Sequence, residues 1–163
     1  MEWTMVEAIA SCVTAFFSAV TAGGVIVVFM QIRWSRKQNV TQFEDEMSRQ
    51  YREILKTIPV KAMLGDELSQ EEFEQAENGI YHYLDLTNEQ VFLRQNERVS
   101  PETWKSWCDG IKSNLSRMAF AQVWKKIKSK VPGSFLELQK LEDRNFEGDP
   151  HRWRELIQPK ISP

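Results

Sequence analysis

The sequence predicts an all-α protein in which a single N-terminal transmembrane helix precedes a cytosolic bundle of about five helices. Three observations lead to this prediction. A stretch of 23 residues near the N-terminus, Ala8–Met30, contains no charged side chain. After it, apolar residues recur at intervals of three and four, which is the period of a helix with one buried face. No segment alternates apolar and polar residues in the way that a half-buried strand does.

The uncharged stretch is long enough to cross a bilayer. As a helix it would extend about 35 Å, whereas the hydrocarbon layer is roughly 30 Å thick. No Lys or Arg precedes it, and Arg33, Arg36 and Lys37 follow it directly. The positive-inside rule therefore predicts a single-pass protein of the inner membrane, with its N-terminus outside and its C-terminal domain in the cytoplasm. Trp3 and Trp34 lie where indoles gather at the two membrane interfaces.

Small residues repeat at every fourth position within this stretch: Ser11, Ala15, Ala19 and Gly23. Such a stripe lets two helix backbones approach closely in lipid, where packing drives association. We therefore expect a homo-oligomer whose transmembrane helices pack through this face. The alternative is a span that is merely rich in small residues and stands alone in the bilayer.

The chain divides into three predicted segments. Residues 1–37 form the anchor with its basic inner flank, residues 38–58 form a juxtamembrane amphipathic helix, and residues 59–163 form the cytosolic helical domain. The apolar stripe of the juxtamembrane helix consists of Val40, Phe43, Met47, Tyr51, Ile54, Leu55 and Ile58. Pro59 ends this helix. Its stripe is expected to pack either on the domain or against its own copy in an oligomer.

Capping signals mark the start of the next two helices. A capping box, Ser69 with Glu72, opens a helix that reaches about Gln95. Ser100–Pro101 then supplies an N-cap and a first-turn proline for a second helix. Residues 60–68 are expected to form the connection that precedes them.

Weaker signals divide the rest of the domain. Ser116 is expected to open a further helix, which Pro132–Gly133 closes. Ser134 with Glu137 has the spacing of another capping box. Asp149–Pro150 is typical of a cap and first turn, and predicts a short amphipathic helix at the C-terminus.

Charge and composition argue against several classes of function. The chain has 21 basic and 23 acidic residues and a net charge of −2, so there is no electrostatic reason to expect DNA or long RNA as a partner. The two cysteines, Cys12 and Cys108, lie far apart in the sequence and suit a reducing compartment. No nucleophile elbow, phosphate-binding glycine loop or Cys-x-x-Cys motif occurs. We therefore expect no enzyme activity, no cofactor and no metal.

Polar residues gather on the helix that begins after Ser69. They are expected to form a network that fixes how the helices pack, with Arg94 or helix termini as further partners. The expected members are Asp85, Asn88, Glu89 and Arg98. The alternative is a metal site, because His82 shares a face with Asp85 and Glu89. Such a site would need a further ligand from a facing helix, for which Asp109 or His151 is the obvious residue.

The strongest basic run of the chain consists of Lys125, Lys126, Lys128 and Lys130. It has three interpretations. Its lysines can hold a phosphodiester while an aromatic ring stacks on a base. They can also contact the anionic cytoplasmic leaflet, or form a solvated helix face. If a ligand binds here, the expected contacts are Arg117, Trp124, Lys125, Lys126 and Lys128.

Residues 81–120 and the helix that follows resemble a functionally uncharacterised family of small bacterial membrane-anchored proteins. The shared pattern is an Asp-Leu-x-Asn-Glu-Gln string, a Trp-x-x-Trp helix and an apolar Phe…Trp helix. Here these positions are Asp85, Leu86, Asn88, Glu89, Gln90, Trp104, Trp107, Phe120 and Trp124. The order of one membrane helix and a small cytosolic domain is also similar to membrane effectors of type III CRISPR defence. That second resemblance implies a cyclic oligonucleotide, an oligoadenylate, as the signal.

Two functions from different classes follow. In the first, the protein is a membrane-anchored sensor or effector in bacterial antiviral defence, whose cytosolic domain binds a nucleotide signal or a partner and acts through the span. In the second, it is a non-enzymatic inner-membrane scaffold or accessory subunit that tethers a protein partner. The small-residue stripe favours the first, because a simple tether has little need of it.

Overall fold

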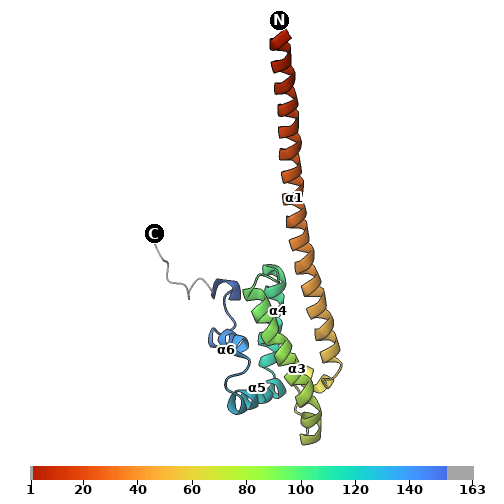
Figure 1. The fold of residues 1–163 in the computed structure, drawn as a ribbon. Coiled ribbons are helices and arrows are strands. Elements are labelled where there is room, and N and C mark those ends of the chain that lie inside the picture. The colour runs from red at the N-terminus through yellow and green to blue at the C-terminus, as the bar shows by residue number, and fades with distance from the viewer. Residues whose placement is uncertain (1, 154–163) are drawn as a thin grey trace, which may run out of the picture. The chain divides into compact units, whose positions relative to one another are not determined.

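The protein is described by a computed structural model, which gives the backbone of residues 2–153 and the side chains of residues 24–35 and 38–153 (Figure 1). The backbone forms the helices α1 (Glu2–Leu55), α2 (Val60–Leu64), α3 (Gln70–Gln95), α4 (Pro101–Leu115), α5 (Met118–Lys130), α6 (Leu136–Asp143) and the 3₁₀ helix η1 (Pro150–Trp153). Residues 2–153 contain no strand, so the all-α prediction is confirmed. The chain separates into two compact units, Met1–Asn39 and Val40–Pro163, which we describe one at a time.

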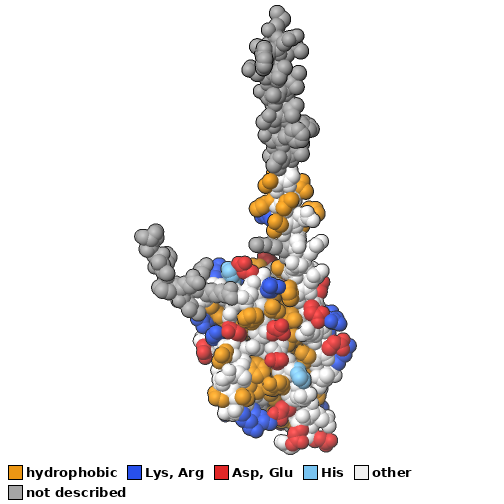
Figure 2. All heavy atoms as spheres, viewed as in Figure 1, with side chains coloured by type: hydrophobic (Ala, Val, Ile, Leu, Met, Phe, Trp, Pro, Cys, Tyr) orange, Lys and Arg blue, Asp and Glu red, His pale blue; other side chains and the backbone are white. Residues whose placement is uncertain are grey.

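The first unit is the N-terminal part of α1. Six consecutive apolar residues, from Val25 to Met30, are each between 52% and 65% exposed (Figure 2). Because consecutive residues of a helix lie about 100° apart, these side chains are apolar around the whole circumference. No helix among the described residues has an apolar stretch long enough to cross a bilayer. The greater part of the predicted span, including Ser11, Ala15, Ala19 and Gly23, lies outside the described side chains.

The second unit is built around α3. Helices α4, α5, α6 and η1 all pack on α3 (Figure 1). The inward face of α3 includes Ile80, Leu84 and Val91, none of which is exposed. On α5, Phe120 is fully buried and its ring meets that of Tyr83 edge to face, with centroids 5.3 Å apart. A single aromatic-rich core therefore extends through this unit.

The C-terminal part of α1 packs on this core through the predicted stripe. Met47 and Ile58 are buried, and Tyr51, Ile54 and Leu55 pack against the core. The chain then crosses α3 at Gly79. A Cβ added there would lie 2.6 Å from Thr57 Oγ1 and 2.8 Å from Ile58 Cγ1. This crossing requires a residue without a side chain.

Two predicted helix starts are confirmed. The hydroxyl of Ser69 accepts from the backbone N–H of Glu72, and the Glu72 carboxylate accepts from that of Ser69, which completes the capping box of α3. Ser100 caps α4 and Pro101 is its first residue. The connection between residues 60 and 68 differs from the prediction, because it contains the one-turn helix α2, which ends at Gly65 with φ of 84°.

Two other predicted starts are wrong. Helix α5 begins at Met118 with Arg117 as its N-cap residue, and the Ser116 hydroxyl donates instead to the carbonyl of Ser113 at 2.7 Å. Helix α6 begins at Leu136, so Ser134 and Glu137 do not form a capping box.

Phe135 explains the altered start of α6. Its ring is buried edge to face against Tyr81 and Trp124, at 5.5 and 6.1 Å between centroids. Residue 135 takes up the left-handed conformation, with φ of 55°, and occupies the N-cap position itself. The packing of this aromatic side chain thus outweighs the local capping signal.

Candidate functional site

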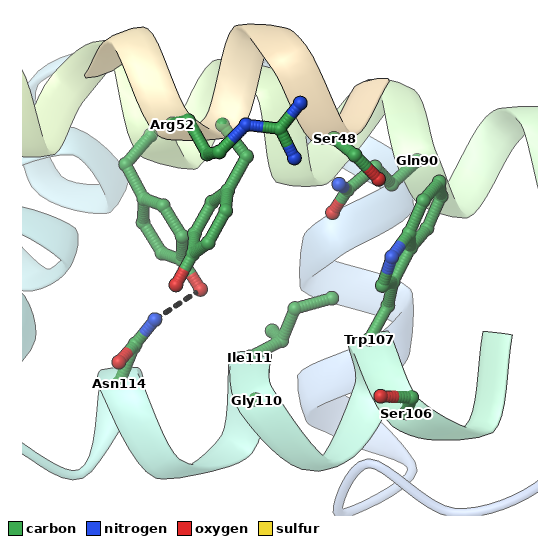
Figure 3. A pocket seen from close by; sticks show the side chains of 10 residues that line it. Ser48, Arg52, Gln90, Ser106, Trp107, Gly110, Ile111 and Asn114 are labelled. Atoms are coloured by element: carbon green, nitrogen blue, oxygen red, sulfur yellow. Dashed lines mark hydrogen bonds between the residues drawn. The ribbon is translucent and has the colours of Figure 1, made fainter. Parts of the chain in front are cut away.

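A cavity of about 370 Å³ lies between α1, α3 and α4 in the second unit (Figure 3). Its lining residues are Ser48, Tyr51 and Arg52 of α1, Tyr83 and Gln90 of α3, and Ser106, Trp107, Gly110, Ile111 and Asn114 of α4. This volume falls in the range of roughly 300–1,000 Å³ that is typical of small-molecule sites. Both apolar and hydrogen-bonding side chains line the walls, as such sites require.

One end of the cavity is fixed by a buried hydrogen-bonded group. Asn114 is 5% exposed and its Nδ2 donates to the hydroxyl of Tyr83 at 2.8 Å, the dashed line in Figure 3. The carboxamide oxygen of Asn114 accepts from Arg117. The rings of Tyr51 and Tyr83 pack at a tilt, with centroids 6.1 Å apart. Burial raises the pKa of Tyr83 to about 12, so its phenol is uncharged at neutral pH.

Gln90 provides a polar group of a different kind. It is 6% exposed, and its carboxamide forms no hydrogen bond with any residue that the structure describes. Figure 3 shows the Gln90 side chain pointing into the cavity beside Ser48. Among the described residues, the fully buried side-chain atoms without a partner are Trp124 Nε1 and His151 Nδ1, whereas the Gln90 carboxamide is open to the cavity and available to a ligand.

The charge of the cavity lining comes from one side chain. Arg52 is exposed at the rim, and no ion pair joins its guanidinium to any of the described residues. No Asp or Glu is among the lining residues. The cavity therefore has a positive rim above uncharged walls.

The predicted basic run lies on α5, away from this cavity, and two of its lysines are ion-paired. Lys126 pairs with Glu77 of α3. Lys128 Nζ lies 2.8 and 2.7 Å from the two carboxylate oxygens of Glu142, on α6. These pairs connect α5 with α3 and with α6.

The other residues predicted for ligand binding are also dispersed. Trp124 is 3% exposed, with Phe135 at its edge and the Lys128 ammonium 5.2 Å from its ring centroid, so a base has no access to the indole face. Lys125 is exposed on α5. Arg117 binds Asn114, which places it behind the wall of the cavity. The structure does not bring the five predicted contacts together.

The predicted polar network is formed only in part. Asn88 does bind a helix terminus, since its Oδ1 accepts from the backbone N–H groups of Glu137 at 3.0 Å and Leu138 at 3.1 Å and so caps α6 from α3. Asp85 and Glu89 are exposed and, with His82, line a shallow hollow beside α1.

The arginines predicted for that network have other partners. The Arg98 guanidinium lies 5.0 Å from the ring centroid of Phe43. Arg94 is 5% exposed and donates to both carboxylate oxygens of Asp149, at 2.7 and 2.5 Å. It also donates to the carbonyl of Val99 at 2.7 Å. This charge pair, of a buried arginine with a half-buried aspartate, therefore joins α3 to the segment before η1.

Metal binding and thiol chemistry find no support in the described part of the chain. Within it, no three His, Cys, Asp or Glu side chains are grouped so that they can hold a metal ion. Cys108 is buried and free, and burial raises the pKa of its thiol to about 11. Cys12 lies outside the described side chains.

Sequence reasoning missed the cavity, although one signal pointed to it. Gln90 lies three residues after Thr87 and seven after Tyr83, which places a polar side chain on the buried face of α3. Comparisons with protein-family models, with curated proteins and with solved structures find no match to this chain. Function is therefore inferred from the cavity and from α1.

Proposed function

We propose that the protein is a membrane-anchored sensor whose cytosolic helical domain binds a small ligand in the cavity between α1, α3 and α4. The observation that carries this proposal is the Gln90 carboxamide, which is buried, unpartnered among the described residues and directed into the cavity. Its donor and acceptor face the cavity and form no hydrogen bond with the described residues, so both can bind a ligand there.

The membrane anchor is supported by the N-terminal sequence. The stretch Ala8–Met30 has no charged residue, and its described part is apolar on every side of the helix. A helix that is apolar all round needs lipid or other protein around it. The basic residues that follow support a cytoplasmic position for the ligand-binding domain. The small-residue stripe supports association of two or more spans.

A helix connects the two parts of this proposed mechanism. Ser48, Tyr51 and Arg52 line the cavity from α1, which is one helix from Glu2 to Leu55. Four residues before Ser48, the Glu44 carboxylate accepts from the backbone N–H of Ser100 at 2.7 Å, where α4 begins. A ligand that prefers one packing of α1 on α4 shifts the equilibrium toward that packing. The span is then the part of α1 that carries the response into the bilayer.

The test uses the full-length protein in detergent micelles. Its thermal unfolding is followed in the presence of a panel of small metabolites that includes linear and cyclic nucleotides. A ligand at 100 times its dissociation constant adds about 2.7 kcal/mol to stability, which is several degrees in Tm for a domain of this size. The expected result is a specific shift in the wild type that Gln90→Leu abolishes and Lys125→Gln retains.

Two results would contradict the proposal. The first is the absence of a shift with any member of the panel, which favours the alternative, an inner-membrane scaffold that tethers a protein partner. The second is an equal shift in the wild type and in Gln90→Leu, which places the ligand elsewhere. A role in antiviral defence stays a prediction from the sequence resemblance.

A further inference from the structure

We infer that the cavity binds a nucleoside phosphate, with the base inside, its hydrogen-bonding edge at Gln90 and its phosphate at Arg52. This inference rests on the proposed function, because it names the class of ligand for the same cavity. It is carried by three properties of the lining: its charge, its aromatic ends and the donor–acceptor pair of one carboxamide.

The charge of the lining selects an anion. Arg52 is the charged residue of the lining, its guanidinium has no ion pair among the described residues, and Figure 3 shows it at the rim above the cavity. A guanidinium binds phosphate through two parallel hydrogen bonds. No lining carboxylate opposes this charge, and the Tyr83 phenol is uncharged at neutral pH, as an ordinary tyrosine is. Among the lining residues, a phosphate therefore meets a charged donor and no carboxylate.

The walls suit a flat ring. Figure 3 places Trp107 and Asn114 at opposite ends of the cavity, with Ile111 between them. The hydrogen bond from Asn114 places Tyr83 at the second end, and Tyr51 packs against Tyr83. Aromatic side chains thus flank a floor formed by an aliphatic one. All four nucleobases can stack on aromatic side chains, because every base has a π-face.

Gln90 allows the cavity to distinguish a nucleotide from other anions that carry a flat ring. Its carboxamide presents a donor and an acceptor side by side, and both are without partners in the described structure. The edges of nucleobases present the complementary pair, and a glutamine can bind such an edge through two hydrogen bonds. A benzoate or an acyl phosphate has no such edge. Gln90 of α3 and Arg52 of α1 both line the cavity, so one nucleotide can place its base at the amide and its phosphate at the arginine.

The size of the cavity limits how much of a larger ligand it holds. About 370 Å³ admits one nucleoside unit, so a cyclic oligonucleotide would place one base inside and the rest at the rim. A free mononucleotide and one unit of a cyclic nucleotide share the chemistry inferred here. Separate titrations distinguish these two sources.

The experiment is isothermal titration of the full-length protein in detergent micelles. The probes are the four nucleoside 5′-monophosphates, the corresponding nucleosides, ribose 5-phosphate and a cyclic dinucleotide. We expect at least one monophosphate to bind about tenfold more tightly than its nucleoside, since a charge-assisted hydrogen bond exceeds a neutral one by this order. Ribose 5-phosphate, which lacks the base, is expected not to bind measurably.

Three variants locate the binding. Arg52→Gln should lower the affinity for the monophosphate about tenfold and leave the affinity for the nucleoside unchanged, because only the phosphate contact is lost. Gln90→Leu should lower the affinities for the monophosphate and for the nucleoside alike. Lys125→Gln, on the basic run of α5, should change neither. Since Arg52 is exposed, its variant tests the inference even if Gln90→Leu does not fold.

The outcomes separate the ligand class from the proposed function. If another small molecule binds in a way that depends on Gln90 and no nucleoside phosphate binds, the ligand class is wrong and the sensor proposal stands. If a monophosphate binds but Arg52→Gln leaves its affinity unchanged while Lys125→Gln lowers it, the phosphate site is the basic run and the inference is overturned. If no probe and no other small molecule binds, both fail. Tighter binding of the cyclic dinucleotide, with the same dependence on Arg52, supports the inference and identifies a cyclic nucleotide as the source.

Discussion

The contacts of α3 with α5 and α6 differ from those around the cavity in how polar side chains are used. Lys126 and Lys128 of α5 are paired with carboxylates of α3 and α6, and Asn88 of α3 satisfies two backbone N–H groups of α6. Around the cavity, Gln90 is buried without a partner among the described residues, and Arg52 has no ion pair there. The first set of contacts stabilises the fold, whereas the second leaves hydrogen-bonding capacity for a ligand. This difference predicts which substitutions cost stability and which cost binding.

The largest loss of stability is expected at the buried charge pair. Asp149→Ala leaves the Arg94 guanidinium, whose side chain is 6% exposed, without its carboxylate. Removing one partner of a fully buried pair costs about 3–5 kcal/mol, and about 2–3 kcal/mol is expected here because Asp149 is 25% exposed. Chemical denaturation of the full-length protein measures this loss. The control is Asp85→Ala on the exposed face of α3, which should change the free energy of unfolding by less than about 0.5 kcal/mol. Equal effects of the two variants would show that the Arg94 pair contributes nothing.

The same pair predicts a dependence on pH. Burial opposes the charge of Asp149, but the hydrogen bonds from Arg94 and from the backbone N–H of His151 outweigh it and hold the pKa of the carboxyl below its ordinary 3.8. A pKa that is lower in the folded state contributes stability that is fully present above pH 3.8 and is lost as the pH falls through the folded value. The gap in Tm between wild type and Asp149→Ala should therefore be constant near neutral pH and close in acid. A constant gap across the acid range would contradict this assignment.

A smaller loss is expected where the chain crosses α3. Gly79→Ala brings a methyl group within 2.6 Å of Thr57 Oγ1 and 2.8 Å of Ile58 Cγ1, and overpacking of this kind costs about 1–3 kcal/mol. The matched control is Gly110→Ala in α4, where nothing lies within 4 Å of the added Cβ. There the better helix propensity of alanine should stabilise the protein by up to about 1 kcal/mol. Opposite signs in thermal unfolding are expected, and stabilisation by both substitutions would mean that the crossing can relax.

A further loss of about 1 kcal/mol is expected from Asn88→Ala. This variant removes the acceptor for the first N–H groups of α6, as the loss of an N-cap does. Ser134→Ala tests the cap that the sequence suggested, and it should change the free energy of unfolding by less than about 0.5 kcal/mol. A larger effect at Ser134 than at Asn88 would reverse our description of this helix start.

The smallest effect is a gain. Gln90→Leu replaces a largely buried carboxamide by an apolar side chain and should raise the stability of the unliganded protein by up to about 1 kcal/mol, while ligand affinity falls. Gains of this kind at a binding site reflect a trade between stability and function. The measurement is Tm without ligand, compared with that of Asn114→Leu, which should be destabilised because it leaves the Tyr83 hydroxyl without its donor. A loss of stability in Gln90→Leu equal to that in Asn114→Leu would assign Gln90 a structural role.

Features that depend on neighbouring residues were predicted well. The capping box of Ser69 with Glu72 and the start of α4 at Pro101 involve groups no more than three residues apart. The apolar stripe around Tyr51 follows from helical spacing alone. The start of α6 was predicted wrongly, because the burial of Phe135 competes with the local signal of Ser134. The residues predicted to bind a ligand do not come together in the structure. This prediction failed because spacing along α5 does not reveal that Glu77 and Glu142 pair with its lysines.

By itself the sequence determined the all-helical class, the two helix starts after residue 68 and the uncharged stretch near the N-terminus. Only the tertiary structure decided which polar groups have partners. Asn88 caps α6 from α3, Glu44 of α1 binds the N-cap residue of α4, and Gln90 faces a cavity between three helices. The physical reason is range: hydrogen bonds within one turn are set by the order of residues along the chain. Bonds between helices depend on which faces meet, and packing of the whole core sets that arrangement.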